Sequence, residues 1–166
     1  MKAGKAVMRT QTEISLRSMT ENDLPAASAL SKALSWPHRL EDWEFMFQLG
    51  EGLVATLENG EIIGTIVWWS FGERYATIGL VIVNNAWQGH GIGTTLMTTV
   101  RRLLPGRVIC LNATAAEQPL YEKLGFVPIG IIEQHQGNGA SAPIVALEAE
   151  HRLRPIVQYD LQELTA

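Results

Sequence analysis

Gln88-Gly89-His90-Gly91-Ile92-Gly93-Thr94 is the stretch of this sequence that decides the fold. It lies between an apolar run at residues 75–83, which predicts a buried strand, and residues 92–104, whose apolar positions recur at helical spacing. A strand, a glycine loop and a helix in this order point several backbone N–H groups at one spot, at the positive end of the helix dipole. Glycine suits such a loop because side chains would block a close approach and because it tolerates a positive φ. The stretch therefore predicts a phosphate-binding loop.

Two familiar kinds of phosphate-binding loop do not fit these residues. A dinucleotide-binding fingerprint needs a third glycine, but Thr94 stands there when the count starts at Gly89, and a leucine stands there when it starts at Gly91. A P-loop ends in Gly-Lys-Ser or Gly-Lys-Thr, but residues 33–122 contain no lysine. Both readings are therefore excluded by residue type.

A third pattern, Gln/Arg-x-x-Gly-x-Gly/Ala, is matched by Gln88, Gly91 and Gly93. This is the pyrophosphate-loop motif of the GNAT N-acetyltransferase superfamily. Further along the chain, residues 119–126 read Pro-Leu-Tyr-Glu-Lys-Leu-Gly-Phe, which is similar to the Leu-Tyr-x-Lys-x-Gly-Phe segment of that family. On these two motifs and their spacing, the chain resembles the GNAT superfamily over about residues 13–149.

The periodicity of apolar residues predicts the order β-α-α-β-β-β-α-β-α-β-β, an α/β (α+β) domain with one mixed sheet. The resemblance implies that this sheet is mostly antiparallel and flanked by helices. The predicted strands cover residues 13–17, 53–57, 62–69, 75–83, 108–111, 127–135 and 143–149. The predicted helices cover residues 20–34, 40–49, 92–104 and 119–124.

The chain divides into three predicted segments. Residues 1–12 are expected to be a flexible N-terminal segment, residues 13–149 the acetyltransferase domain, and residues 150–166 a C-terminal tail. The tail repeats part of the start of the domain at constant spacing, with Leu16-Arg17, Asp23-Leu24 and Ala29 recurring as Leu153-Arg154, Asp160-Leu161 and Ala166. Two interpretations of this repeat are equally supported: the tail is the start of a second GNAT-like copy, or it is a plain C-terminal strand and helix.

The composition fits one globular domain and excludes some partners. Of the 166 residues, 46% are apolar and only 18% are charged, whereas about 25% charged residues is usual for soluble domains. The deficit indicates a large core, a homodimer interface or a missing partner segment. The net charge of −4 argues against a nucleic-acid partner.

A single cysteine, Cys110, excludes a disulfide framework and any Cys-x-x-Cys metal or redox pair, so no metal ion is expected. It adjoins no histidine, which argues against an acyl-cysteine route, and we expect it to be buried in its strand. The N-terminus lacks a signal-peptide core, and no apolar stretch approaches the roughly 20 residues that span a bilayer. These features predict a soluble cytoplasmic protein with no membrane partner.

The resemblance implies acetyl-CoA as the acetyl donor and a primary amine as the acceptor, reacting directly in a ternary complex. It also implies that the strand near residues 80–83 pairs with the pantetheine amides and supplies a backbone N–H for the oxyanion. The candidate donor-binding residues are Val81, Ile82, Val83, Gln88, Gly89, His90, Gly91, Ile92, Gly93, Thr94 and Asn112.

Tyr121 occupies the position from which the family protonates the departing thiolate, and a phenol with a pKa of about 10 is a proton donor at neutral pH. The alternative is an ordinary tyrosine of an amphipathic helix. An alkyl amine must first lose a proton, so a base is required. His135 and Glu73 rank first among the candidates, ahead of Glu133 and His38.

Trp36, His38 and Arg39 lie between the first two predicted helices, which line the acceptor cleft in this family. Bulky aromatic side chains there are candidates for sorting acceptors, and packing of Trp36 and Trp43 in the core is the alternative. The acceptor can be a small molecule or a protein amine.

Two functions from different classes compete: an N-acetyltransferase, and a catalytically silent CoA-binding or regulatory module. A binding module needs only the glycine loop. The presence of Tyr121 together with Gln88, Gly91 and Gly93 therefore favours the enzyme.

Overall fold

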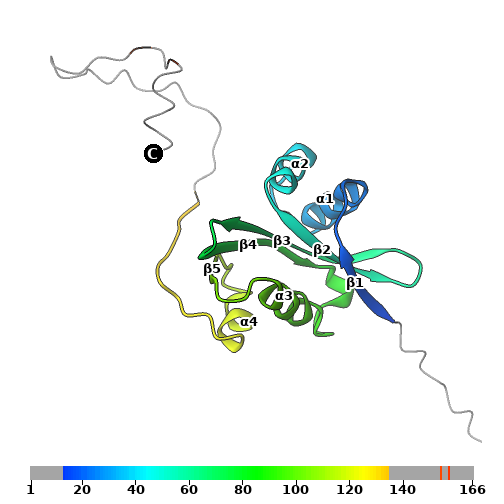
Figure 1. Cartoon of the computed structure of the whole chain (residues 1–166). Coiled ribbons are helices and arrows are strands. Elements are labelled where there is room, and N and C mark those ends of the chain that lie inside the picture. Colours follow the sequence, from blue (N-terminus) through cyan, green and yellow to red (C-terminus); the bar gives the residue numbers. More distant parts are fainter. Residues whose placement is uncertain (1–12, 135–153, 155–156, 158–166) are drawn as a thin grey trace, which may run out of the picture. The chain divides into compact units, whose positions relative to one another are not determined.

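A five-stranded sheet in the order β1-β2-β3-β4-β5 organises the domain (Figure 1). The computed structural model describes residues 13–134, 154 and 157. Neighbouring strands from β1 to β4 run antiparallel, and β5 is parallel to β4. The strands are β1 (Ile14–Ser18), β2 (Glu51–Leu57), β3 (Ile62–Phe71), β4 (Tyr75–Val83) and β5 (Val108–Leu111).

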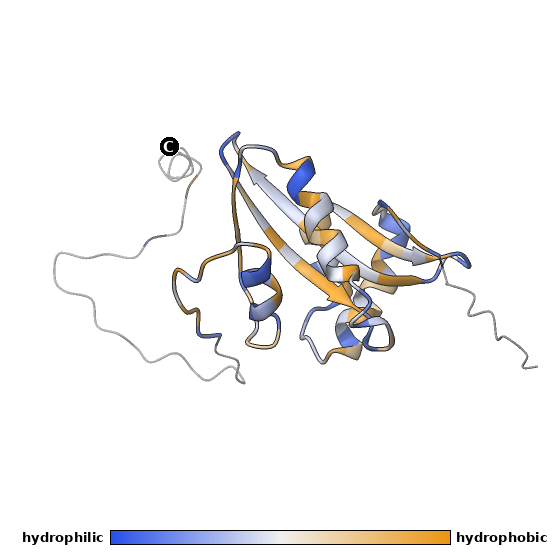
Figure 2. Cartoon of the chain, turned by 90° about the horizontal axis from the view of Figure 1, so that it is seen from below, coloured by the Kyte–Doolittle hydropathy of each residue, from blue (hydrophilic) through white to orange (hydrophobic). Residues whose placement is uncertain are grey.

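Helices cover both faces of this sheet (Figure 1). The α-helices are α1 (Leu24–Ala33), α2 (Leu40–Gln48), α3 (Ile92–Leu103) and α4 (Gln118–Lys123). Two short 3-10 helices, η1 (Glu21–Asp23) and η2 (Asn85–Trp87), precede α1 and the glycine loop. Figure 2 shows hydrophobic residues concentrated along the strands and hydrophilic residues at hairpin tips.

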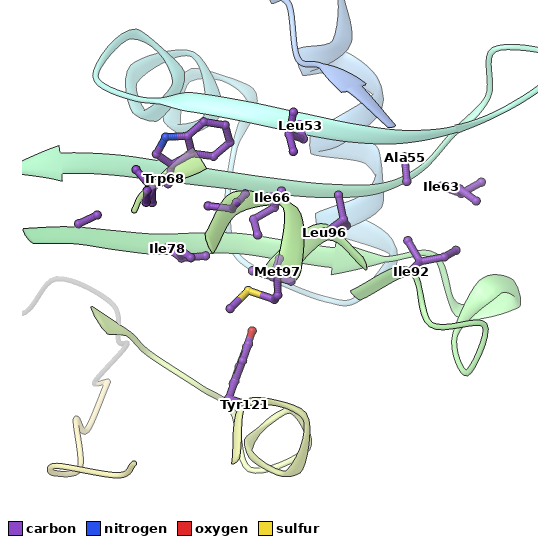
Figure 3. Packing of buried hydrophobic residues seen from close by; sticks show 14 residues of the cluster. Leu53, Ala55, Ile63, Ile66, Trp68, Ile78, Ile92, Leu96, Met97 and Tyr121 are labelled. Atoms are coloured by element: carbon purple, nitrogen blue, oxygen red, sulfur yellow. The ribbon is translucent and has the colours of Figure 1, made fainter. Parts of the chain in front are cut away.

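The sheet separates two hydrophobic clusters. One joins α1 and α2 to residues such as Val54, Val67 and Ile82. The other joins α3 and α4 to residues such as Ile66 and Ile78, and it includes Tyr121 and Met97 (Figure 3). The consecutive Trp68 and Trp69 point to opposite faces, as alternation along a strand requires, and belong to different clusters.

The predicted order of elements is confirmed from β1 to α4, but the strand expected at residues 127–135 does not form over residues 127–134. Val127 is 77% exposed and Ile129 is 92% exposed. Alternating apolar residues favour a strand only where a neighbouring strand pairs with them, and none does so among the described residues.

The remaining predictions at the two ends lie outside the described residues. These are the segment of residues 1–12, the strand of residues 143–149, His135, and most of the tail. The chain divides into one compact unit up to Gly130 and another from Ile131, and each is described by itself. In the second unit residues 131–134, 154 and 157 are described and carry no helix or strand.

The expected burial of Cys110 is wrong, since its side chain is exposed. In β5 the buried and exposed positions alternate, with Val108 and Cys110 on the exposed face and Ile109 and Leu111 packed against the cluster of α3. Val108 is 57% exposed and Cys110 is also exposed, so this face of β5 is not covered by the described residues.

Candidate active site

The glycine loop opens directly onto the first turn of α3. Gly91 is the N-cap residue of α3 with φ +79°, and Gly89 has φ +78°. Both lie in the left-handed region that residues with a Cβ rarely adopt. A Cβ at either position would meet no atom of the described residues within 4 Å, so the described part of the chain leaves the space over the loop open.

The backbone donors at the start of α3 are free for an anion. No side chain caps this helix, and its first turn contains no acidic residue. The first N–H groups of a helix have no partner within the helix and carry its positive dipole end. The loop therefore fits a phosphate group by its backbone, its dipole and its open space.

Polar side chains before the loop fix its shape. The Gln88 side-chain amide donates to the Val83 carbonyl at 3.2 Å and to the Asn85 Oδ1 atom at 3.0 Å. The Asn84 Oδ1 atom accepts from the Ala86 N–H at 3.0 Å, which holds the turn of η2. Gln88 thus links the end of β4 to the turn before the loop, because its amide nitrogen makes both of these hydrogen bonds.

His90 is also held within the loop. Its Nδ1 atom lies 3.2 Å from the Trp87 carbonyl oxygen and 3.0 Å from the Gln88 carbonyl oxygen. Both neighbours are acceptors, so Nδ1 carries a proton and donates to them, which fixes the orientation of the ring. The ring also packs near Trp87, with 5.6 Å between centroids.

The pairing of β4 with β5 ends before the glycine loop begins. Their pairing begins at Tyr75 and Val108 and ends at Ile78 and Leu111, whereas β4 continues to Val83. Residues 79–83 of β4 therefore keep one edge that no described strand covers. The Asn84 N–H donates to the Ile63 carbonyl of β3 at 2.8 Å, so by alternation the backbone groups of Val83 point away from β3.

Gly93 brings three elements close together. A Cβ on Gly93 would lie 3.3 Å from the Leu120 Cδ2 atom of α4 and 3.8 Å from the Val83 Cγ2 atom of β4. The start of α3 therefore approaches both the end of β4 and the helix that carries Tyr121. Asn112 follows β5 directly, at the end where the two parallel strands part.

Tyr121 points from α4 towards Met97 of α3 with its hydroxyl foremost (Figure 3). The residue is 4% exposed, and its ring makes an edge-on contact with Phe126. Burial, and to a lesser extent the charge of Glu117, raises the pKa of the Tyr121 phenol above its usual value. Its hydroxyl makes no hydrogen bond within the described residues, and the raised pKa keeps the phenol neutral at physiological pH.

The structure does not bring Glu73 to this end of β4. Glu73 lies in the turn between β3 and β4, whereas the glycine loop follows the other end of β4. The nine residues of β4 span about 30 Å at about 3.3 Å per residue. His135, the other leading candidate base, lies outside the described residues.

The three candidate acceptor residues lie together between α1 and α2. Trp36 packs partly against the cluster of α1 and α2, and its ring lies 5.7 Å from that of His38. The Nδ1 atom of His38 is buried and has no hydrogen-bond partner among residues 13–134. Trp43, by contrast, is fully buried and donates to the Ser31 Oγ atom at 3.1 Å, so its role is packing.

Arg39 is engaged in local structure. It precedes α2 as the N-cap residue, and its guanidinium pairs with the Asp42 carboxylate at 2.7 Å and 3.1 Å. The hydrogen bonds from the Arg39 side chain, followed by the one from its N–H, lower the pKa of Asp42 to about 2. This side chain is therefore committed to the helix start.

Sequence reasoning missed three residues that shape the site. Asn84 and Asn85 build the turn that delivers the loop, and Thr65 of β3 donates to the Leu80 carbonyl of β4. The asparagine pair was visible as turn chemistry. The Thr65 contact joins residues far apart in sequence, and no local pattern marks it.

Comparison with known proteins identifies the class of domain that carries this site. Residues 49–128, which run from the start of β2 through α4, match the family model of the GNAT acetyltransferase domain. The uncharacterized N-acetyltransferase YitH of Bacillus subtilis is 30% identical over 133 residues, which cover 79% of this chain and 46% of that protein. This chain thus spans about half the length of that relative.

Solved structures share the fold at lower identity. An acetyltransferase of Trypanosoma brucei superposes with a TM-score of 0.60 at 22% identity, covering 75% of this chain and 99% of the other. A GCN5-related N-acetyltransferase of Ralstonia eutropha gives a TM-score of 0.59 at 17% identity, covering 75% and 99%. These likenesses show the fold, and the family match shows an acetyltransferase domain of the GNAT family at residues 49–128.

Helices that could span a membrane and groups of metal-binding side chains are both absent from the part of the chain that the structure describes. None of the helices there is both long and apolar enough to cross a membrane. No group of three or more His, Cys, Asp or Glu side chains gathers as a metal site in the same part of the chain.

Proposed function

We propose that the domain transfers the acetyl group of acetyl-CoA to a primary amine by direct attack. The observation that carries the proposal is the open edge of β4 at residues 79–83, which leads straight into the uncapped start of α3. An extended amide chain can pair with a free strand edge, and a pyrophosphate can bind at a helix start. The donor molecule has both parts in that order.

The residues present fit each part of the donor. The N–H groups at Ile92, Gly93 and Thr94 would hold the pyrophosphate, with open space over Gly89 and Gly91. The uncovered edge around Val81, Ile82 and Val83 would pair with pantetheine. The engaged side chain of Gln88 contributes by fixing the loop, and His90 and Asn112 flank it.

Once the ammonium form of the acceptor has lost a proton to a base, the remaining steps balance with one protein acid. The amine nitrogen attacks the thioester carbonyl carbon, and a β4 backbone N–H stabilises the negative oxygen. The C–S bond then breaks, and the Tyr121 hydroxyl gives its proton to the thiolate of CoA. The nitrogen loses its extra proton, which returns to the tyrosinate through solvent, so the products are an amide and a free thiol.

The acceptor is a primary amine, free or on a protein, and we propose that His38 and Trp36, between α1 and α2, contact it. The buried Nδ1 atom of His38, which lacks a partner, supports a polar contact there. We also propose that the domain extends to residue 149 and that the protein forms a homodimer.

The test is thiol release from acetyl-CoA with a panel of alkyl amines, polyamines, amino acids and peptides, beside a CoA binding isotherm. We expect CoA binding and transfer to at least one class of amine. CoA binding without transfer to any class would indicate a silent binding module, and no CoA binding would overturn the proposal.

A further inference from the structure

β4 contains one residue more than the stretch of β3 that faces it. Thr65 pairs with Ile82 and Val67 pairs with Gly79, so Leu80 and Val81 together face Ile66 alone. This is a β-bulge, which bends a strand and redirects its side chains. Leu80 has φ +50°, in the left-handed region, although it carries a branched side chain and follows a glycine.

The bulge changes which residues of β4 face each cluster. Before it, Ala76 and Ile78 belong to the cluster of α3; after it, Val81 does. Leu80 and Ile82 belong to the cluster of α1 and α2. Without the extra residue, strand alternation would keep all even-numbered positions on one face. The bulge therefore lies where β4 leaves β5 and sets the orientation of everything that follows.

Thr65 holds the bulge through one hydrogen bond. Its Oγ1 atom donates to the Leu80 carbonyl oxygen at 2.8 Å, and the side chain is 0% exposed on β3. A left-handed conformation is unfavourable for a residue with a Cβ, so the surrounding contacts must impose it. A buried hydroxyl bonded to that carbonyl is such a contact.

The peptide unit that follows Leu80 connects this bond to the chemistry. The Leu80 carbonyl and the Val81 N–H belong to one planar trans peptide, so they point in opposite directions. When Thr65 fixes the carbonyl oxygen, it also directs the Val81 N–H away from itself. The direction of that N–H is then decided by a side chain of the neighbouring strand.

We propose that Thr65 is a positioning residue, which holds the Leu80–Val81 peptide so that the Val81 N–H binds the oxyanion of the acetyl-transfer reaction. The inference rests on the proposed function. It selects one donor from the N–H groups of residues 80–83 and names the side chain that aims it. Thr65 itself touches neither the acetyl group nor the amine.

The test compares Thr65→Val, which removes the hydroxyl at equal size, with Thr65→Ser, which keeps it. Thr56→Val is the matched control, because Thr56 is a buried threonine of β2 whose hydroxyl meets Ser15 at 3.1 Å, away from the bulge. For Thr65→Val we expect kcat to fall by roughly ten- to a hundredfold, as a misplaced donor does, with the KM for acetyl-CoA within about threefold.

We expect Thr65→Ser and Thr56→Val to keep kcat close to that of the parent protein. Equal kcat values for Thr65→Val and Thr56→Val would overturn the inference, as would a Thr65→Ser variant as slow as Thr65→Val. If the parent protein transfers no acetyl group, the proposed function fails by itself.

One readout is independent of activity. The NMR carbonyl resonance of Leu80 should shift in Thr65→Val and stay in place in Thr65→Ser, because only the valine removes the donor. An unchanged Leu80 resonance in Thr65→Val would overturn the positioning role even if the enzyme is active.

Discussion

At the scale of single residues, the burial of Tyr121 determines the protonation state of its phenol. A phenol in water is a weak acid with a pKa of about 10, and its burial beside Glu117 raises that pKa. Tyr121 therefore stays neutral over the whole physiological range, which is the state that the proposed proton donor needs. Its position in α4 was visible in the sequence, but its buried environment was not.

Tyr121→Phe should lower kcat by roughly a hundredfold, the usual contribution of a general acid. Tyr75→Phe is the control, because Tyr75 is half-exposed at the far end of β4. Because the raised pKa keeps Tyr121 protonated below pH 10, its titration should not shape the pH profile of the parent protein there. Any pH-dependent loss of activity in that range should therefore also be seen in Tyr121→Phe. An undiminished kcat in Tyr121→Phe would remove the assignment.

At the scale of elements, the glycine loop depends on backbone conformation more than on side chains. Gly91 and Gly106 offer a matched comparison: their φ values are +79° and +74°, and a Cβ at either meets nothing within 4 Å. Gly106 lies after α3, far along the chain from the loop. Alanine at either position should cost a similar amount of folding free energy, about 1 kcal/mol.

Only Gly91→Ala should weaken CoA binding. A Cβ over the loop would occupy the space that the pyrophosphate needs, and the loss of one hydrogen bond to a charged group corresponds to roughly a tenfold change in Kd. Calorimetry with CoA on both variants gives the measurement. Equal affinities for Gly91→Ala and Gly106→Ala would argue against phosphate binding at this loop.

The elements also show what the sequence can and cannot reveal. The strand, loop and helix around residues 75–104 were predictable, because helical and alternating periodicity and glycine spacing are local signals. The bulge at Leu80 and its bond to Thr65 were not, because register depends on a partner strand. The expected strand at residues 127–135 failed over its described part for the same reason: its pattern is local, but a strand needs a neighbour.

At the scale of the whole molecule, one ion pair ties the start of the sheet to the first helix. The Arg17 guanidinium of β1 donates to both oxygens of Asp23 in η1, at 2.7 Å and 2.8 Å, and the Thr20 N–H and hydroxyl donate to the same carboxylate. The Arg17 hydrogen bonds, with those from Thr20, lower the pKa of Asp23 to about 2. The carboxylate is 9% exposed and the arginine 45%.

Because the folded pKa lies below the ordinary value of 3.8, the ion pair stabilises the fold above about pH 4, and this stability is lost as the pH falls towards 2. Asp23→Asn should lower the free energy of unfolding at pH 7 by about 1–2 kcal/mol, after allowance for the half-exposed Arg17. It should also flatten the pH dependence between about 4 and 2.

Chemical denaturation at a series of pH values measures this effect. Asp42→Asn is the control, since its partner Arg39 is 73% exposed, and it should change stability less. An acid profile of Asp23→Asn that parallels the parent protein would contradict the assigned role of the pair.

The bulge in β4 also bears on how this domain can vary in length. Past Leu80, every side chain of β4 and the start of the glycine loop depend on one additional residue for the side of the sheet on which they lie. A deletion there would leave a regular ladder while exchanging the positions that face the two hydrophobic clusters. The number of residues in β4 is therefore as much a requirement as their identity, and an alignment gap or an engineered insertion belongs in the turns before and after this strand.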